Sequence, residues 1–230
     1  MKYVGLKEAV LHKKVNRFIA EVYVDGQLEE VHIKNTGRLA ELMIKGKKVL
    51  LEPSSNPKRK TRFSLVAINH MDTWVSVDSQ IPNLVAFQAI FEGKIHQIGQ
   101  VDVLKKEVKY GSSRFDLYYE KGIQKGFIEV KGVTLANSGV AKFPDAPSIR
   151  ATKHVLELTE LMKKGYEATV LFIVQIPNCT HFEPFVEMDA AFSNALIQGA
   201  HEGLQIIAYE GIFKGNTVDL GQEIPIKLPQ

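Results

Sequence analysis

The sequence contains a single cysteine, Cys179, which excludes an internal disulfide and a zinc site built from several cysteines. Its longest apolar run, 168–176, is too short to cross the ~30 Å hydrocarbon core of a bilayer. The N-terminal residues lack the apolar stretch of a secretory signal. A Gly-x-x-x-x-Gly-Lys phosphate loop is also missing, which argues against an NTP-driven enzyme. These absences predict a soluble, cytoplasmic protein that does not bind membranes.

What the sequence does contain is an uneven distribution of charge. The net charge of the 230 residues is only +3, and the apolar share of 45% is typical of globular proteins. Residues 34–62, however, hold nine basic side chains against Glu41 and Glu52. Four of these cations follow Asn56-Pro57, a dipeptide that marks a turn. The block is either a solvated surface or a polyanion-binding site of the kind used for nucleic acids.

Short strands dominate the first 80 residues. The pair formed by 17–24 and 28–33 is joined by Asp25-Gly26, a typical hairpin turn. Three more strands are expected at 48–52, 63–69 and 73–77. Five short strands in this length predict a small closed barrel, most often of the oligonucleotide-binding (OB) type. Residues 1–80 are therefore expected to form an OB-type nucleic-acid-binding domain.

Helices and buried strands alternate in residues 81–230, which predicts a second, α/β domain. The helix expected at 147–164 is capped by Asp145 or Ser148. The other expected elements are a helix at 83–91, strands at 114–119, 127–133, 167–176 and 204–209, and a helix at 189–202.

Two carboxylates and a lysine form the most informative cluster in this second domain. Glu129 and Lys131 are two residues apart and share one face of a strand. If strands 114–119 and 127–133 form a hairpin centred between Gly122 and Ile123, Asp116 lies opposite Glu129. Opposed carboxylates need a cation or a proton between them, and Mg²⁺ suits such oxygen ligands. The alternative is an ordinary charged strand face on which Lys131 neutralises Glu129.

The arrangement of Asp116, Glu129 and Lys131 resembles the PD-(D/E)XK nuclease superfamily. Longer segments, distributed in order over nearly the whole chain, resemble the sugar fermentation stimulation protein family. They are HIKNTGR (32–38), NPKRKT (56–61), EVKYG (107–111), SRFD (113–116), EVK (129–131) and FPDA (143–146).

This resemblance implies a mixed α+β and α/β protein of two domains, an N-terminal five-stranded OB-type β-barrel and a C-terminal PD-(D/E)XK nuclease-like mixed sheet flanked by helices. It implies catalytic roles for Asp116, Glu129 and Lys131, with Glu107 as a further acidic candidate. Asp116 and Glu129 would bind Mg²⁺ or Mn²⁺. Where relatives tend to place a Glu on the first helix, this chain has Gln88, which puts a further acidic ligand in doubt.

The expected activity is DNA binding together with divalent-metal-dependent hydrolysis of phosphodiesters. The alternative is a non-catalytic DNA-binding regulator of sugar metabolism genes, and RNA is a further candidate partner. The sequence leaves the oligomeric state open, a homodimer included. The residues expected to contact nucleic acid are Asn35, Thr36, Arg38, Lys58, Arg59, Lys60, Arg62, Arg114, Arg150 and His154.

Overall fold

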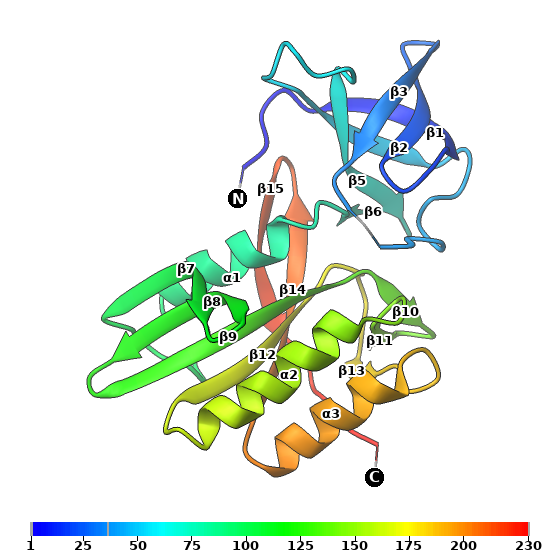
Figure 1. The fold of residues 1–230 in the computed structure, drawn as a ribbon. Coiled ribbons are helices and arrows are strands. Elements are labelled where there is room, and N and C mark those ends of the chain that lie inside the picture. The colour runs from blue at the N-terminus through cyan, green and yellow to red at the C-terminus, as the bar shows by residue number, and fades with distance from the viewer. Residues whose placement is uncertain (1, 36, 230) are drawn as a thin grey trace.

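A computed structural model describes residues 2–35 and 37–229 and shows a β-barrel lying against a larger domain with a mixed sheet (Figure 1). None of the described helices is long and apolar enough to cross a membrane. The division expected at residue 80 falls between the last strand of the barrel sheet and the first helix, α1.

The N-terminal sheet has the order β3-β2-β1-β4-β5-β6, and an additional pairing of β3 with β5 closes it into a barrel. Alternate side chains of its strands point inward and exclude water, among them Leu11, Val22, Val31, Leu51 and Leu65. This confirms the predicted five-stranded barrel. Its strands are β1 (Lys7–Lys14), β2 (Ile19–Val24), β3 (Gln27–Ile33), β4 (Lys48–Pro53) and β5 (Phe63–His70), and β6 (Thr73–Ser76) extends the sheet.

The identity of one barrel strand differs from the prediction. The strand at Lys7–Lys14 was not predicted, because its pairing with β2 shifts between Leu11 and Lys13 and this bulge interrupts the apolar alternation. The segment predicted at 73–77 forms β6, which pairs with β5 outside the closed ring.

The C-terminal sheet has the order β15-β14-β12-β9-β8-β7. Its central strands β9, β12 and β14 are parallel, and antiparallel strands lie at both edges. Helix α1 covers one face, and α2 and α3 cover the other (Figure 1). The elements are α1 (Ile81–Phe91), β7 (Val103–Tyr110), β8 (Ser113–Lys121), β9 (Gln124–Val133), β10 (Leu135–Asn137), β11 (Val140–Phe143), α2 (Ile149–Met162), β12 (Glu167–Val174), β13 (His181–Pro184), α3 (Ala190–His201), β14 (Gln205–Lys214) and β15 (Thr217–Glu223).

The expected helices and buried strands of this domain are present, and Ser148 is the N-cap of α2, accepting a hydrogen bond from the N–H of Ala151. Asp145, the other expected cap, instead accepts the backbone N–H of Arg38 in the barrel domain. Strands β7, β10, β11, β13 and β15 were not predicted. The edge strand β7 has charged, exposed side chains and therefore lacks the apolar pattern of a core strand.

The two domains meet through an apolar cluster that includes Val66 of the barrel, Val85 of α1 and Phe213 of β14. Helix α1 begins close to β9, because a Cβ added to Gly132 would lie 2.6 Å from Cγ of Pro82. A glycine at position 132 thus permits the first turn of α1 to approach the strand that carries Glu129 and Lys131.

Candidate functional site

Strands β8 and β9 separate where the two candidate carboxylates lie. Their ladder has the predicted hairpin register, with Lys121 opposite Gln124, but its last pair is Leu117 and Ile128. On the other side, the ladder of β7 and β8 skips the pair Glu107–Asp116, and Glu107 has a φ of 57°, unusual for a residue other than glycine. Asp116 is therefore free of regular pairing on both sides, and its side chain can take the place of a backbone acceptor.

The Asp116 carboxylate is held by two hydrogen bonds. Its Oδ2 accepts the N–H of Val130 at 2.8 Å, and its Oδ1 accepts the side-chain amide of Asn83 in α1 at 2.8 Å. Burial, followed by the negative charge of Glu129, nevertheless raises the pKa of Asp116 above its ordinary value. The two hydrogen bonds thus fix the position of the carboxylate, while its burial and the nearby Glu129 disfavour its ionised form.

Glu129 is buried, with only 3% of its surface exposed, and one of its oxygens has two partners. Oε1 lies 2.6 Å from Nζ of Lys131 and 2.5 Å from Nδ1 of His154 in α2. Burial acts to raise the pKa of Glu129, but the hydrogen bond with His154 and the charge of Lys131 outweigh it, so this pKa is lowered. The other oxygen, Oε2, is buried and has no hydrogen-bond partner within residues 2–35 and 37–229.

The structure thus brings Asp116, Glu129 and Lys131 together, and it adds His154 behind Glu129. His154 was expected to contact nucleic acid, but it is 4% exposed and its ring contacts the carboxylate and Phe115. Among the described residues, no cluster of three or more His, Cys, Asp or Glu could hold a metal ion.

Glu107 and Gln88 lie apart from this centre. The Glu107 carboxylate is half exposed and forms an ion pair of 2.7 Å with Arg114, which was itself expected to contact nucleic acid. Gln88 is exposed on α1 and donates to Glu92. The α1 residue that reaches Asp116 is Asn83, which the sequence analysis missed. Its position in the first turn after Pro82 was the only available signal.

The basic loop connects β4 to β5, which is one of the two loops that OB barrels use to bind oligonucleotides. Lys58 and Lys60 are exposed on it and form no ion pair among the described residues. Arg62 is paired with Glu29 of β3. The Arg59 guanidinium shapes the loop from inside by donating to Thr61, Ser64 and the carbonyl of Phe63.

The second such loop, between β1 and β2, contains Phe18, which is 47% exposed with the Arg17 guanidinium 5.9 Å from its ring centre. The Phe18 carbonyl accepts the N–H of Ile33, and the preceding residue, His32, pairs with Ser64 beside Arg59. Both loops therefore lie next to the C-terminal end of β3. A cationic loop and an exposed aromatic ring are the two features of an oligonucleotide-binding barrel surface.

Asn35 and Arg38 lie at the junction of the domains. The Asn35 side chain accepts the N–H of Gly37 and donates to the carbonyl of Val77, and the backbone of Arg38 binds Asp145. Thr36 lies outside the described residues. Arg150 is exposed at the start of α2, one turn before His154.

A closed OB-type barrel joined to a mixed α/β sheet with paired carboxylates defines a two-domain class, and comparison with known proteins agrees. The family model of the SfsA N-terminal OB domain matches residues 13–77, and that of the sugar fermentation stimulation protein RE domain matches residues 80–217. The chain belongs to the sugar fermentation stimulation protein (SfsA) family. Its OB domain suggests nucleic-acid binding.

Relatives cover the chain almost completely. The sugar fermentation stimulation protein homolog of Alkaliphilus oremlandii is 47% identical over 98% of both chains, and that of Clostridium beijerinckii is 40% identical over 99% of this chain and all of its own. Among solved structures, SfsA of Pyrococcus furiosus in complex with Ca²⁺ has a TM-score of 0.89 and 26% identity, covering 99% of this chain and 98% of its own.

The raised pKa of Asp116 predicts that Asp116→Asn stabilises the metal-free protein at pH 7. Folding favours the protonated carboxyl, so the cost of ionisation is absent below the ordinary Asp pKa of ~3.9, grows as the pH rises from that value to the raised pKa, and is complete above it. The amide of the variant retains an acceptor for the Val130 N–H without the charge, and Asn83 can turn its own amide so that its oxygen accepts from the new NH2 group. We expect a gain of roughly 0.5–2 kcal/mol in the free energy of unfolding, measured by urea denaturation in EDTA.

The gain should shrink as the pH is lowered toward ~4, because the wild-type carboxyl then takes up a proton. Glu187→Gln, which removes an exposed carboxylate, is the control and should change little at either pH. A lower stability of Asp116→Asn at pH 7 would show that the charge of Asp116 is well compensated without a metal.

Proposed function

We propose that this protein binds nucleic acid through its barrel and hydrolyses phosphodiester bonds at Asp116, Glu129 and Lys131 with a divalent cation. The observation that carries the proposal is the buried Oε2 of Glu129, which lacks a hydrogen-bond partner in the described part of the chain and lies near a second carboxylate. A buried carboxylate oxygen without a partner is costly, and a cation bound by both side chains would remove the cost.

The residues present fit such a cation. Mg²⁺ is usually held in proteins by one or two carboxylates, with waters and substrate phosphate oxygens completing its octahedron. Asp116 and Glu129 would be these two ligands, and Mn²⁺ accepts the same donors. The solved structure of the Pyrococcus furiosus relative contains Ca²⁺, another cation that prefers oxygen ligands, which supports a divalent site in the family. When bound, the cation would polarise the phosphoryl group and acidify a bound water.

The surrounding residues orient this centre and balance its charge. Asn83 and the N–H of Val130 fix the Asp116 carboxylate. His154 holds Oε1 of Glu129, so that Oε2 remains available. Lys131 has its ammonium 2.6 Å from the same Oε1, where it can stabilise the negative charge that develops on a phosphate in the transition state.

The barrel would supply most of the affinity for the polymer. Lys58 and Lys60 present two exposed cations on the β4–β5 loop, and Phe18 offers a ring on which a base can stack. This arrangement suits DNA or RNA, since phosphates and base faces are common to both.

One observation favours a second candidate, a DNA-binding regulator without catalysis. Lys131 already forms an ion pair with Glu129 without a metal, and His154 adds a hydrogen bond to the same oxygen. A charge-balanced centre of this kind can be structural, as in the charged strand face considered for the sequence. Cleavage by the purified protein separates the two candidates.

We expect the wild-type protein to cleave DNA or RNA in Mg²⁺ or Mn²⁺ and not in EDTA. Lys131→Met retains the aliphatic stem but removes the ammonium, and it should lower the cleavage rate on the order of 10²–10³-fold, as for the loss of other transition-state donors. Lys125→Met is the matched control. Lys125 is exposed on the same strand, and an even number of positions separates it from Lys131. Failure of the wild-type protein to cleave any nucleic acid with either metal would leave the regulator as the function.

The double variant Lys58→Ala/Lys60→Ala should bind nucleic acid more weakly, and its affinity should depend less on salt. Each lost phosphate contact lowers the slope of log affinity against log salt by roughly 0.7–0.9. Fluorescence anisotropy with a labelled oligonucleotide in EDTA measures this slope. Lys125→Ala/Lys227→Ala removes the same charge from exposed positions elsewhere and should keep the wild-type slope. Equal slopes for all three proteins would show that the basic loop is a solvated surface.

A further inference from the structure

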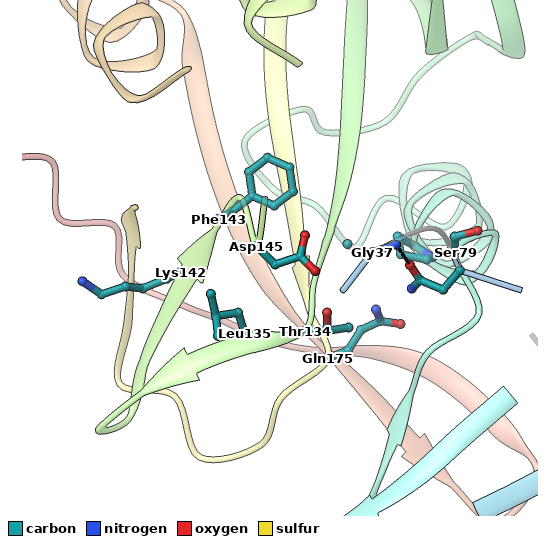
Figure 2. A pocket seen from close by; sticks show the side chains of 11 residues that line it. Gly37, Ser79, Thr134, Leu135, Lys142, Phe143, Asp145 and Gln175 are labelled. Atoms are coloured by element: carbon teal, nitrogen blue, oxygen red, sulfur yellow. Dashed lines mark hydrogen bonds between the residues drawn. The ribbon is translucent and has the colours of Figure 1, made fainter. Parts of the chain in front are cut away.

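A pocket of about 190 Å³ lies between the barrel and the C-terminal domain, outside the carboxylate centre. Figure 2 shows that Thr134, Asp145 and Gln175 direct their polar groups into the same space. Thr134 and Gln175 directly follow the C-terminal ends of β9 and β12, two neighbouring parallel strands. Ligands of open α/β sheets bind at this edge, outside the carboxyl ends of the strands.

The side chain of Gln175 provides a second, independent observation that points to a bound molecule in this pocket. Only 4% of the surface of this residue is exposed, and its buried Oε1 has no hydrogen-bond partner among the described residues. Its backbone N–H is fixed by the carbonyl of Val133, which sets the direction of the side chain. Burial of an unpaired amide oxygen is unfavourable, so its retention here is explained if a molecule in the pocket donates to it.

The lining points to a neutral, planar molecule and away from a phosphate. Asp145 contributes a carboxylate, which repels phosphate, and Thr134 and Gln175 contribute a hydroxyl and an amide. The one lining cation, Lys142, has its ammonium 3.9 Å from Glu183 and 5.1 Å from the ring centre of Phe185. Pro82 adds an apolar wall. The volume is below the ~300–1,000 Å³ of pockets for drug-sized ligands and suits a single heteroaromatic unit.

Nucleobases have the matching chemistry. A glutamine amide pairs with a donor and an acceptor on a base edge, and a carboxylate accepts from an exocyclic amino group. The pocket is also adjacent to the proposed reaction centre, because Gly132 follows Lys131 and Pro82 precedes Asn83. On the barrel side, Asn35 lies three residues beyond His32, the partner of Ser64 beside the basic loop. The lining of the pocket thus includes neighbours of the reaction centre and a residue of the segment that follows β3.

We propose that this pocket holds one unpaired nucleobase of the bound strand, so that the substrate class is nucleic acid with an unpaired nucleotide near the scissile phosphate. This inference rests on the proposed function. A paired base would have to be unstacked and extruded first, a cost that is least for single strands, bulges and mismatches. The pocket would thereby select unpaired substrates at the binding step, before any chemistry.

The test compares three DNA probes in EDTA: a single strand, a duplex with one bulged nucleotide and a fully paired duplex. We expect the wild-type protein to bind the first two at least tenfold more tightly than the third. Gln175→Leu, which removes an unpaired buried polar group with little change in volume, should reduce this preference about tenfold and leave binding of the paired duplex unchanged. Gln124→Leu alters an exposed glutamine of β9 and should behave as wild type. Thermal unfolding checks that both variants are folded.

A second readout uses the wild-type protein alone. A fluorescent adenine analogue at the bulge should change its emission on binding, and the same analogue placed three base pairs away should not. Equal affinity of the wild type for paired and unpaired probes, or an unchanged preference in Gln175→Leu, would overturn the nucleobase pocket while leaving the proposed function intact. Absence of binding to every probe would instead refute the proposed function and the pocket with it.

Discussion

The centre of this molecule depends on one buried carboxylate, that of Glu129. It lies in the interior, where one oxygen contacts an ammonium and an imidazole and the other has no hydrogen-bond partner among the residues that the structure describes. A buried charge is tolerable only where partners are held in place around it. The two partners of Glu129 lie at different distances from it in the sequence. Lys131 is two residues away on the same strand, whereas His154 requires α2 to pack on the sheet.

The second carboxylate is held by an interruption of regular structure. At Asp116 the ladder of β8 and β9 stops, and the side chain accepts the N–H of Val130 that a backbone carbonyl would otherwise accept. The two carboxylates therefore sit side by side with their pKa values displaced in opposite directions, up for Asp116 and down for Glu129. Opposed displacement of neighbouring acids is a frequent property of reaction centres.

The junction of the barrel and the sheet domain is formed by segments that also carry the sequence motifs of the family. Asp145 binds the backbone of Arg38, Gly132 lets α1 approach β9, and the pocket with Gln175 lies between these contacts. Asn35 and Arg59 were expected to contact nucleic acid, but their side chains form hydrogen bonds within the protein. Their side chains shape the loops and the junction on which a polymer would lie.

Sequence patterns correctly predicted those features of the site that follow from the local periodicity of strands. Alternation placed Glu129 and Lys131 on one face, and the hairpin centre at Gly122 and Ile123 gave the correct register of β8 and β9. The patterns did not reveal β1, in which a bulge breaks the alternation, or the charged edge strand β7. Contacts made across elements, such as Asn83 with Asp116, follow from tertiary packing and leave no periodic signal.

Binding of Mn²⁺ to the metal-free protein tests the central claim most directly. Calorimetric titration should show one site in the wild type, strongly weakened in both Asp116→Asn and Glu129→Gln, because each variant removes a charged ligand. Glu187→Gln, which changes an exposed carboxylate, should bind as the wild type does. Unchanged Mn²⁺ affinity in Asp116→Asn and Glu129→Gln would contradict the account, since the two carboxylates would then not be the metal ligands.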